Sequence, residues 1–167
     1  GEYDIPLPDC GSWWLAGPFG KVEHLPKSDG RFDPQKPFID RPWNKRSSIR
    51  AFVEFNHVLR PKASNANSPT LDGWAVAVSK LQAPKEMTVD VRLAWDDHLI
   101  LKINDDPPID LGSQPYIRAR SVKVKLRKGT NEVQVWLTNR VGVTRGAWNF
   151  AFRATTSEGI IVHPKAE

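Results

Sequence analysis

The chain has 167 residues, a mass of 18.8 kDa and a formal net charge of +5, with 26% charged residues. This length and composition are typical of one globular domain and exclude an intrinsically disordered chain. Because Cys10 is the sole cysteine, an internal disulfide framework and a cysteine-built zinc site are excluded. No apolar stretch approaches the roughly 20 residues of a membrane span. Seven tryptophans in a short basic chain indicate flat apolar surfaces that bind a ligand.

The N-terminal half predicts strands on either side of a long loop. Residues 12–19 are expected to form a strand that ends at Gly17-Pro18. Residues 20–48 contain four prolines, which predicts a surface loop, and loops of this length are often functional. Apolar and polar residues alternate over 47–59, and 72–79 is a further apolar segment, so we expect both to be strands.

The C-terminal half alternates more regularly. Apolar residues occupy every second position in five segments, 89–95, 99–103, 121–126, 132–138 and 148–153. Strands with one apolar and one polar face form antiparallel sheets that pack as a sandwich. The sequence therefore predicts a single all-β domain over residues 1–167, an antiparallel β-sandwich of about eight strands arranged as a jelly roll.

Several short motifs follow one another in a characteristic order. They are W-L-A-G-P-F at 14–19, G-R-F-D at 30–33, Asp96-Asp97 followed by Asn104, L-R-K-G-T-N-E-V at 126–133, Asn139, and W-N-F at 148–150. In this order they resemble the galactose-binding-domain-like β-sandwich modules that accompany secreted bacterial glycoside hydrolases and related polysaccharide-degrading enzymes. Asp105 stands where such modules usually have a glycine, and Asp adopts a positive φ less readily than Gly.

The resemblance implies a carbohydrate-binding module that is not an enzyme and that targets an attached catalytic domain to a polysaccharide. It also implies a secreted, periplasmic or cell-surface bacterial protein. We expect a monomer with no membrane partner and no nucleic-acid partner. Modules of this fold also serve as structural or interaction domains within multidomain glycoside hydrolases or lyases, and the fold alone does not decide between the two functions.

The positive charge is concentrated in the C-terminal half. Residues 111–157 contain nine basic residues and one acidic residue, whereas the rest of the chain has a net charge of −3. Arg118 and Arg120 are expected to share one strand face, and Lys123 and Lys125 to share the outward face of the next segment. Rows of like charge repel unless an anion relieves them. We therefore expect these four residues to bind an acidic glycan, sulfated or uronate-bearing; the alternative is a solvated strand face with edge-protecting lysines.

Four aromatic residues are further candidates for ligand binding. Alternation places Trp136 on the polar face of its strand, where a sugar ring could stack on it; the alternative is packing beneath a loop. Trp43 is a candidate sugar platform in the proline-rich loop or a plug that holds this loop down. Trp13 is the surface candidate of the Trp13-Trp14 pair, and Tyr116 is a candidate hydrogen-bond donor or a ring that caps the core. The other tryptophans, Trp14, Trp74, Trp95 and Trp148, are expected in the core.

Clustered aspartates raise the question of a metal ion. Aspartates in loops supply the hard oxygen ligands that Ca²⁺ prefers, and those close in sequence are Asp96, Asp97, Asp105, Asp106 and Asp110. No EF-hand spacing is present, and the histidines show no ligand spacing for a transition metal. We therefore assign no cofactor and no metal ligands, and leave open a structural Ca²⁺ ion.

Overall fold

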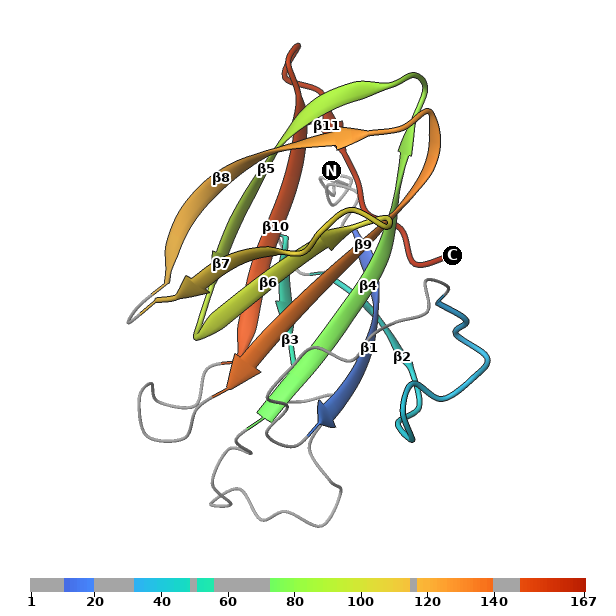
Figure 1. Ribbon diagram of the computed structural model, residues 1–167, viewed down its shortest axis with the longest axis vertical. Coiled ribbons are helices and arrows are strands. Elements are labelled where there is room, and N and C mark those ends of the chain that lie inside the picture. Colours follow the sequence, from blue (N-terminus) through green and yellow to red (C-terminus); the bar gives the residue numbers. More distant parts are fainter. Residues whose placement is uncertain (1–10, 20–31, 49–50, 56–72, 115–116, 140–147) are drawn as a thin grey trace, which may run out of the picture.

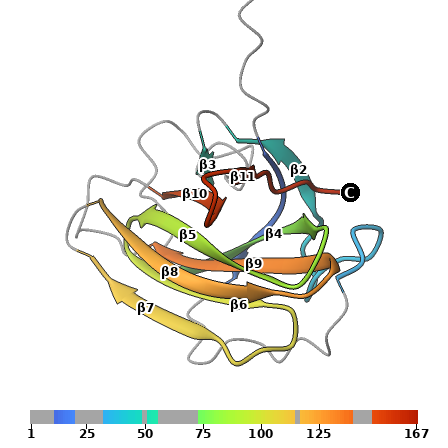
Figure 2. The same cartoon turned by 90° about the horizontal axis from the view of Figure 1, so that it is seen from above.

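A computed structural model describes residues 11–19, 32–48, 51–55, 73–114, 117–139 and 148–167, which form two antiparallel β-sheets. The sheets lie face to face as two layers (Figures 1 and 2). In spatial order the six-stranded sheet contains β2 (Asn44–Ser47), β1 (Ser12–Phe19), β4 (Gly73–Ala83), β9 (Gly129–Asn139), β6 (His98–Ile103) and β7 (Ile109–Ser113). The predicted all-β antiparallel sandwich is confirmed. Within the described ranges no helix is long and apolar enough to span a membrane.

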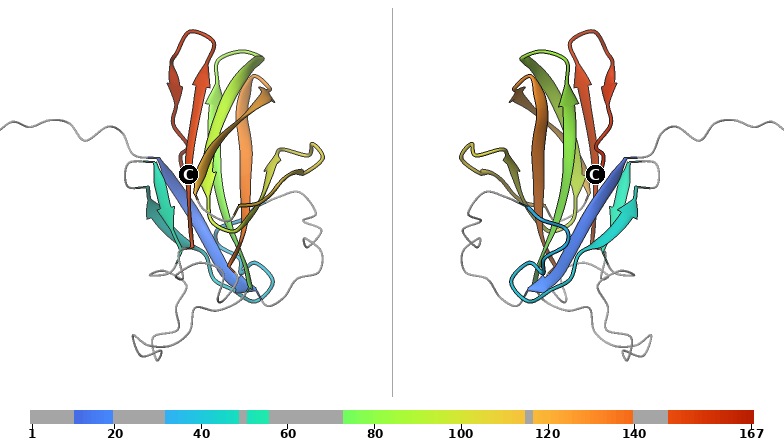
Figure 3. Two further views of the ribbon diagram at one scale, coloured as in Figure 1. Left: turned by 90° about the vertical axis from the view of Figure 1, so that its left-hand side faces the viewer. Right: turned by 90° about the vertical axis from the view of Figure 1, so that its right-hand side faces the viewer.

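The second sheet has five strands. In spatial order they are β11 (Ile161–Val162), β10 (Asn149–Thr156), β5 (Met87–Trp95) and β8 (Arg118–Leu126), and β3 (Phe52–Glu54) also pairs with β10. Strand β8 forms one edge of this sheet, and Figure 3 shows the two layers from the side.

The main core lies between the two sheets. Alternate residues of β5, from Val89 to Trp95, are completely buried and pack with Val133, Val135 and Leu137 of β9. This is the inward face that the alternating pattern predicts. Trp95 and Trp148 are buried in this core, which confirms their predicted placement.

Three strands of the described structure are not predicted from the sequence. Strand β2 consists of polar residues at a sheet edge within the predicted loop, β7 follows two prolines, and β11 has two residues. Strand β2 is polar, and β7 and β11 contribute only Ile109, Leu111 and Val162 to the core, which is too few residues for a recognisable alternating pattern. The strand predicted over 47–59 is limited to β3 in its described part, and residues 20–31 and 62–70 lie outside the described residues.

A second apolar cluster covers the outer face of the six-stranded sheet. Phe19, Val76, Val78 and Trp136 point outward there and are buried. The rings that pack against them are Phe32, Phe38, Trp43 and Trp74. Strand β4 is therefore buried on both faces, which explains its continuous apolar run.

A tight turn joins β6 to β7. Asn104 has a φ of 48°, and Asp106 N donates a hydrogen bond to Ile103 O at 3.1 Å. Because Asn104 itself takes the left-handed conformation, which Asn tolerates, Asp105 does not need the freedom of a glycine. The turn therefore forms although Asp105 replaces the usual glycine.

Asn131 fastens this turn to the β8–β9 turn. Its side chain is completely buried, and its Oδ1 accepts a hydrogen bond from Asn104 Nδ2 at 2.9 Å. Its Nδ2 donates to Arg127 O at 2.9 Å and to Gly129 O at 3.1 Å. Gly129 has a φ of 95°, which favours glycine. The L-x-x-G-x-N motif thus holds two hairpin ends together.

Candidate functional site

The outer face of the five-stranded sheet is exposed and basic. On β8, Lys123 and Lys125 alternate with the buried Val124 and Leu126, so they point outward as predicted. Lys123 lies opposite Asp90 of β5 in the strand register, without an ion pair within 4.0 Å among the described residues. Both ammonium groups are therefore available to an anionic ligand.

Arg118 and Arg120 lie on the opposite face of the same strand. They pair with Trp95 and Leu93 of β5, whose side chains point into the core. Arg120 Nη1 donates a hydrogen bond to Leu111 O at 2.8 Å, and its guanidinium lies 5.9 Å from the Trp95 ring centroid. Arg120 thus joins the edges of the two sheets. The four predicted basic residues do not form one continuous row.

Trp136 does not offer a surface for a sugar. It lies on the outer face of its sheet, as alternation predicts, but it is only 1% exposed. Phe38 and Phe19 pack against it at centroid distances of 5.7 Å and 6.4 Å, and its Nε1 donates to Gln134 Oε1 at 3.1 Å. The prediction of an exposed Trp136 is wrong because the loop that contains Phe38 covers it.

The predicted placement of Trp13 and Trp14 is reversed. Trp13 is 1% exposed, and its ring makes edge contacts with Phe150 and Phe152 at 5.2 Å and 5.1 Å. Trp14 lies half-buried on the other face, with Lys45 Nζ 5.6 Å from its ring centroid. The register of β1 turns Trp13 inward with Leu15, so Trp13 is a core residue and not a ligand platform.

Trp43 anchors the proline-rich loop. Its half-buried ring makes an edge contact with Phe32 at 4.5 Å and lies 5.5 Å from Phe38. Of the two alternatives for Trp43, the structure shows the plug. Trp74 is half-buried against the same cluster, outside the main core. Tyr116 lies outside the described residues.

Two arginines and an aromatic ring lie together on the exposed face, which the sequence does not predict. Arg92 of β5 and Arg153 of β10 lie directly opposite each other, and both are exposed. Phe52 of β3 lies on the same face opposite Ala151 and is 46% exposed. Each strand shows an outward residue in its own pattern, but only the pairing of distant strands brings these residues together.

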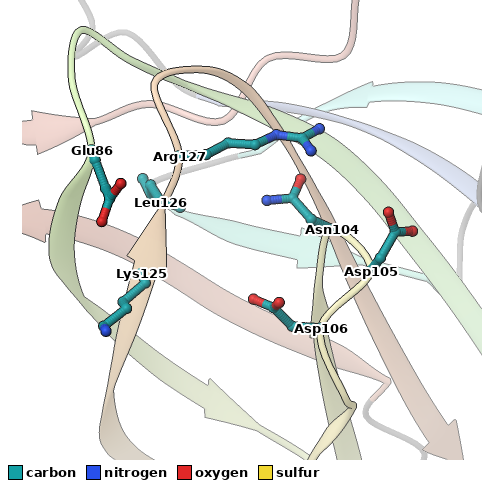
Figure 4. A pocket seen from close by; sticks show the side chains of 7 residues that line it. All are labelled: Glu86, Asn104, Asp105, Asp106, Lys125, Leu126 and Arg127. Atoms are coloured by element: carbon teal, nitrogen blue, oxygen red, sulfur yellow. The ribbon is translucent and has the colours of Figure 1, made fainter.

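A cleft of about 300 Å³ lies at one end of the sandwich between the strand turns. The lining residues are Glu86, Asn104, Asp105, Asp106, Lys125, Leu126 and Arg127. Figure 4 shows Asn104, Asp105 and Asp106 on one turn and Arg127 extending toward their side from the neighbouring turn. The Asn104 amide is already bonded to Asn131 and Glu132, and Arg127 Nε donates to Thr130 O at 3.3 Å. The cleft offers donors and acceptors but no aromatic platform.

The clustered aspartates do not assemble a calcium site. Asp96 and Asp97 are buried at the β5–β6 turn, whereas Asp105 and Asp106 are exposed beyond the far end of β6. In the described part of the chain, no three carboxylate, imidazole or thiol groups gather as metal ligands. The predicted neighbours therefore do not fit a Ca²⁺ ion.

The fifth aspartate, Asp110, is bonded within the protein. Its Oδ1 lies 2.6 Å from His98 Nε2 and accepts a hydrogen bond from Gly112 N at 2.9 Å. Burial raises the pKa of the Asp110 carboxyl, but the bonds to His98 and Gly112 outweigh this effect, so the pKa is lowered. This carboxylate stabilises the β6–β7 pair and remains ionised at neutral pH.

Comparisons with known proteins identify the fold. No protein-family model and no curated protein sequence matches the chain. Two structures of a β-glucosidase from Kluyveromyces marxianus match it with TM-scores of 0.54 and 0.50, at 15% and 16% identity, over 86% and 70% of this chain. This chain spans 16% and 15% of those enzyme chains.

A lectin-like domain matches over almost its whole length. The Epithelial Adhesin 9 A domain from Candida glabrata, solved in complex with Galβ1-4GlcNAc, has a TM-score of 0.50 and 9% identity. The match covers 92% of this chain and 84% of the adhesin domain. The likeness is one of fold. It shows that this chain shares the fold of these domains.

Proposed function

We propose that this chain is a non-catalytic carbohydrate-binding module whose ligand is an acidic polysaccharide. The observation that carries the proposal is the exposed basic face of the five-stranded sheet, on which the side chains of Lys123 and Lys125 point to solvent. The fold shared with an adhesin domain that was solved with a bound disaccharide supports a glycan as the ligand class. Lysine and arginine bind carboxylate and sulfate groups through charge-assisted hydrogen bonds, which favours sulfated or uronate-bearing glycans.

The proposed role is to hold an attached catalytic domain at its substrate, outside the cell. The match to a segment of a β-glucosidase supports a place within a larger enzyme. The bonds of Asp110 to His98 and Gly112 give this carboxylate a structural role.

Affinity electrophoresis tests this function. The domain is run through native gels that contain polygalacturonate, alginate or chondroitin sulfate, with galactomannan and xylan as neutral controls. Salt is set at about 0.1 M and about 1 M, where charges act over about 10 Å and about 3 Å. We expect retardation by acidic polysaccharides that falls steeply at high salt. Equal migration in all gels at low salt would refute the proposal.

The β-glucosidase match also supports a second candidate, a structural domain that packs against a catalytic neighbour. A basic face would then contact an acidic surface of that neighbour. Co-expression as separate chains distinguishes the two functions. A stable complex with the neighbour, together with no retardation by any glycan, would favour the structural domain.

A further inference from the structure

The strand register arranges the exposed residues of the five-stranded sheet in rows that cross the strands. In one row Arg153 of β10 lies opposite Arg92 of β5, and Arg92 lies opposite Ser121 of β8. In the adjacent row Phe52 lies opposite Ala151, Ala151 opposite Ala94, and Ala94 opposite Ala119. A basic row thus runs beside a row of three alanines that ends at an aromatic ring.

The basic row places two like charges directly opposite each other. Like charges directly opposite each other on neighbouring strands destabilise a sheet. Among the described residues, neither the Arg92 guanidinium nor the Arg153 guanidinium has a hydrogen bond or an ion pair. An anionic group placed between two guanidinium groups accepts hydrogen bonds from both and removes the repulsion. The pair is therefore arranged to hold a carboxylate or sulfate group.

The alanine row forms a floor beside this pair. Alanine side chains are short, whereas Arg92 and Arg153 extend from one side of the row and Phe52, 46% exposed, stands at its end. Four strands cross the row at spacings of about 4.8 Å, which makes a track of roughly 14 Å. An extended chain can lie along this floor, with a sugar ring stacked on Phe52.

We propose that this track binds an acidic polysaccharide chain that runs across β3, β10, β5 and β8, with a carboxylate or sulfate group between Arg92 and Arg153. The proposal rests on the proposed function and locates its binding site. Lys123 and Lys125 lie further along β8 on the same face, where they attract the polyanion to the track. The cleft of Figure 4 lies at the strand ends and is not required.

The test uses paired variants with equal charge changes. Arg92→Ala/Arg153→Ala removes the pair, and Arg46→Ala/Lys85→Ala removes two exposed charges from β2 and from the β4–β5 turn. Affinities for polygalacturonate and chondroitin sulfate are measured by calorimetry at low salt. We expect the first variant to bind about tenfold or more weakly and the control to bind within about twofold of the wild type.

Two further variants define the contacts. Arg92→Lys/Arg153→Lys keeps the charge but loses the planar guanidinium groups, which can each donate two hydrogen bonds to one anionic group. We therefore expect an affinity between those of the wild type and the alanine pair. Phe52→Ala removes the stacking surface, and we expect a loss of several fold that persists at high salt. Removal of the arginine pair relieves repulsion, so the melting temperature of the Arg92→Ala/Arg153→Ala variant should equal or exceed that of the wild type. This measurement shows whether the variant is folded.

The outcomes separate the site from the function. If the wild type binds acidic glycans and both alanine pairs weaken binding equally, the track is wrong and the function stands. If the wild type binds no acidic glycan, the function and the site both fail. If single-stranded DNA binds as tightly as the acidic glycans and displaces them, the ligand class is a general polyanion and the proposal is overturned.

Discussion

Asn131 joins two turns of the sandwich through one buried side chain. Its amide makes hydrogen bonds to Arg127 O, Gly129 O and Asn104 Nδ2, and its Oδ1 also accepts from Arg127 N at 3.0 Å. Such a group is costly to remove, because its backbone partners are then left in a site closed to water. Single residues of this kind determine the geometry of the hairpin ends.

We expect Asn131→Ala to lower the free energy of unfolding by roughly 2–4 kcal/mol, because the partners of a completely buried side chain lose their hydrogen bonds. Urea denaturation measures the change. Gln82→Ala is the matched control, since the Gln82 side chain is exposed and is hydrogen-bonded to the Thr130 hydroxyl at 2.8 Å. Its cost should stay below about 1 kcal/mol. Equal losses in the two variants would contradict the role assigned to Asn131.

Asp110 makes stability depend on pH. Its pKa is lowered in the folded protein, so its contribution is present above the unfolded pKa of about 3.9 and is lost as the pH falls through the folded value. We expect Asp110→Asn to lower the melting temperature by about 1–3 °C at pH 7, with the difference vanishing in acid. Melting curves from acidic to neutral pH measure this, with Asp105→Asn as control. A difference that persists in acid would contradict this role.

At the scale of elements, residues 32–43 determine which sheet face is open. Phe32, Phe38 and Trp43 cover the outer face of the six-stranded sheet, whereas the outer face of the other sheet carries charged residues and small side chains. The six-stranded sheet is thus covered on its outer face, and the proposed glycan site lies on the open face of the other sheet. This division explains why tryptophans are abundant although few of them are exposed.

We expect Trp43→Ala to cost about 2–4 kcal/mol and to expose residues 32–43 to proteases, because the ring links Phe32 to Phe38. Chymotrypsin cleavage after Phe38 measures the release of this segment. Binding of acidic glycans should be unchanged, since the two outer faces lie on opposite sides of the sandwich. A loss of glycan binding in a folded variant would place the site on the six-stranded sheet instead.

The alternation of apolar and polar residues predicts most of the fold, because apolar residues at every second position mark the buried face of each strand. It places Val89 to Trp95 correctly, and it also places Trp136 on the outer face of β9. It cannot show that a segment far away in sequence covers Trp136. The pairing of Arg92 with Arg153 is likewise set by the register of β5 with β10, which no local pattern contains. The site was therefore less predictable than the strands.

At the scale of the whole molecule, the charge is divided between surfaces. The described basic residues of 111–157 lie on both faces of β8, on the β8–β9 turn and on β10. The positive charge counted in this stretch of sequence therefore does not form one patch among them. The outer face of the five-stranded sheet receives Lys123, Lys125 and Arg153 from this region and Arg92 from outside it. Folding thus assembles the proposed binding surface from separate parts of the chain.

Chemical-shift mapping tests the central claim most directly. Uniformly ¹⁵N-labelled protein is titrated with short uronate oligosaccharides at low salt. We expect the largest shifts at the backbone amides of Phe52, Arg92, Ser121 and Arg153, with little change on β4 and β9. Shifts confined to the six-stranded sheet, or to Asp105 and Asp106 at the strand-end cleft, would contradict the assignment of the open face as the binding surface.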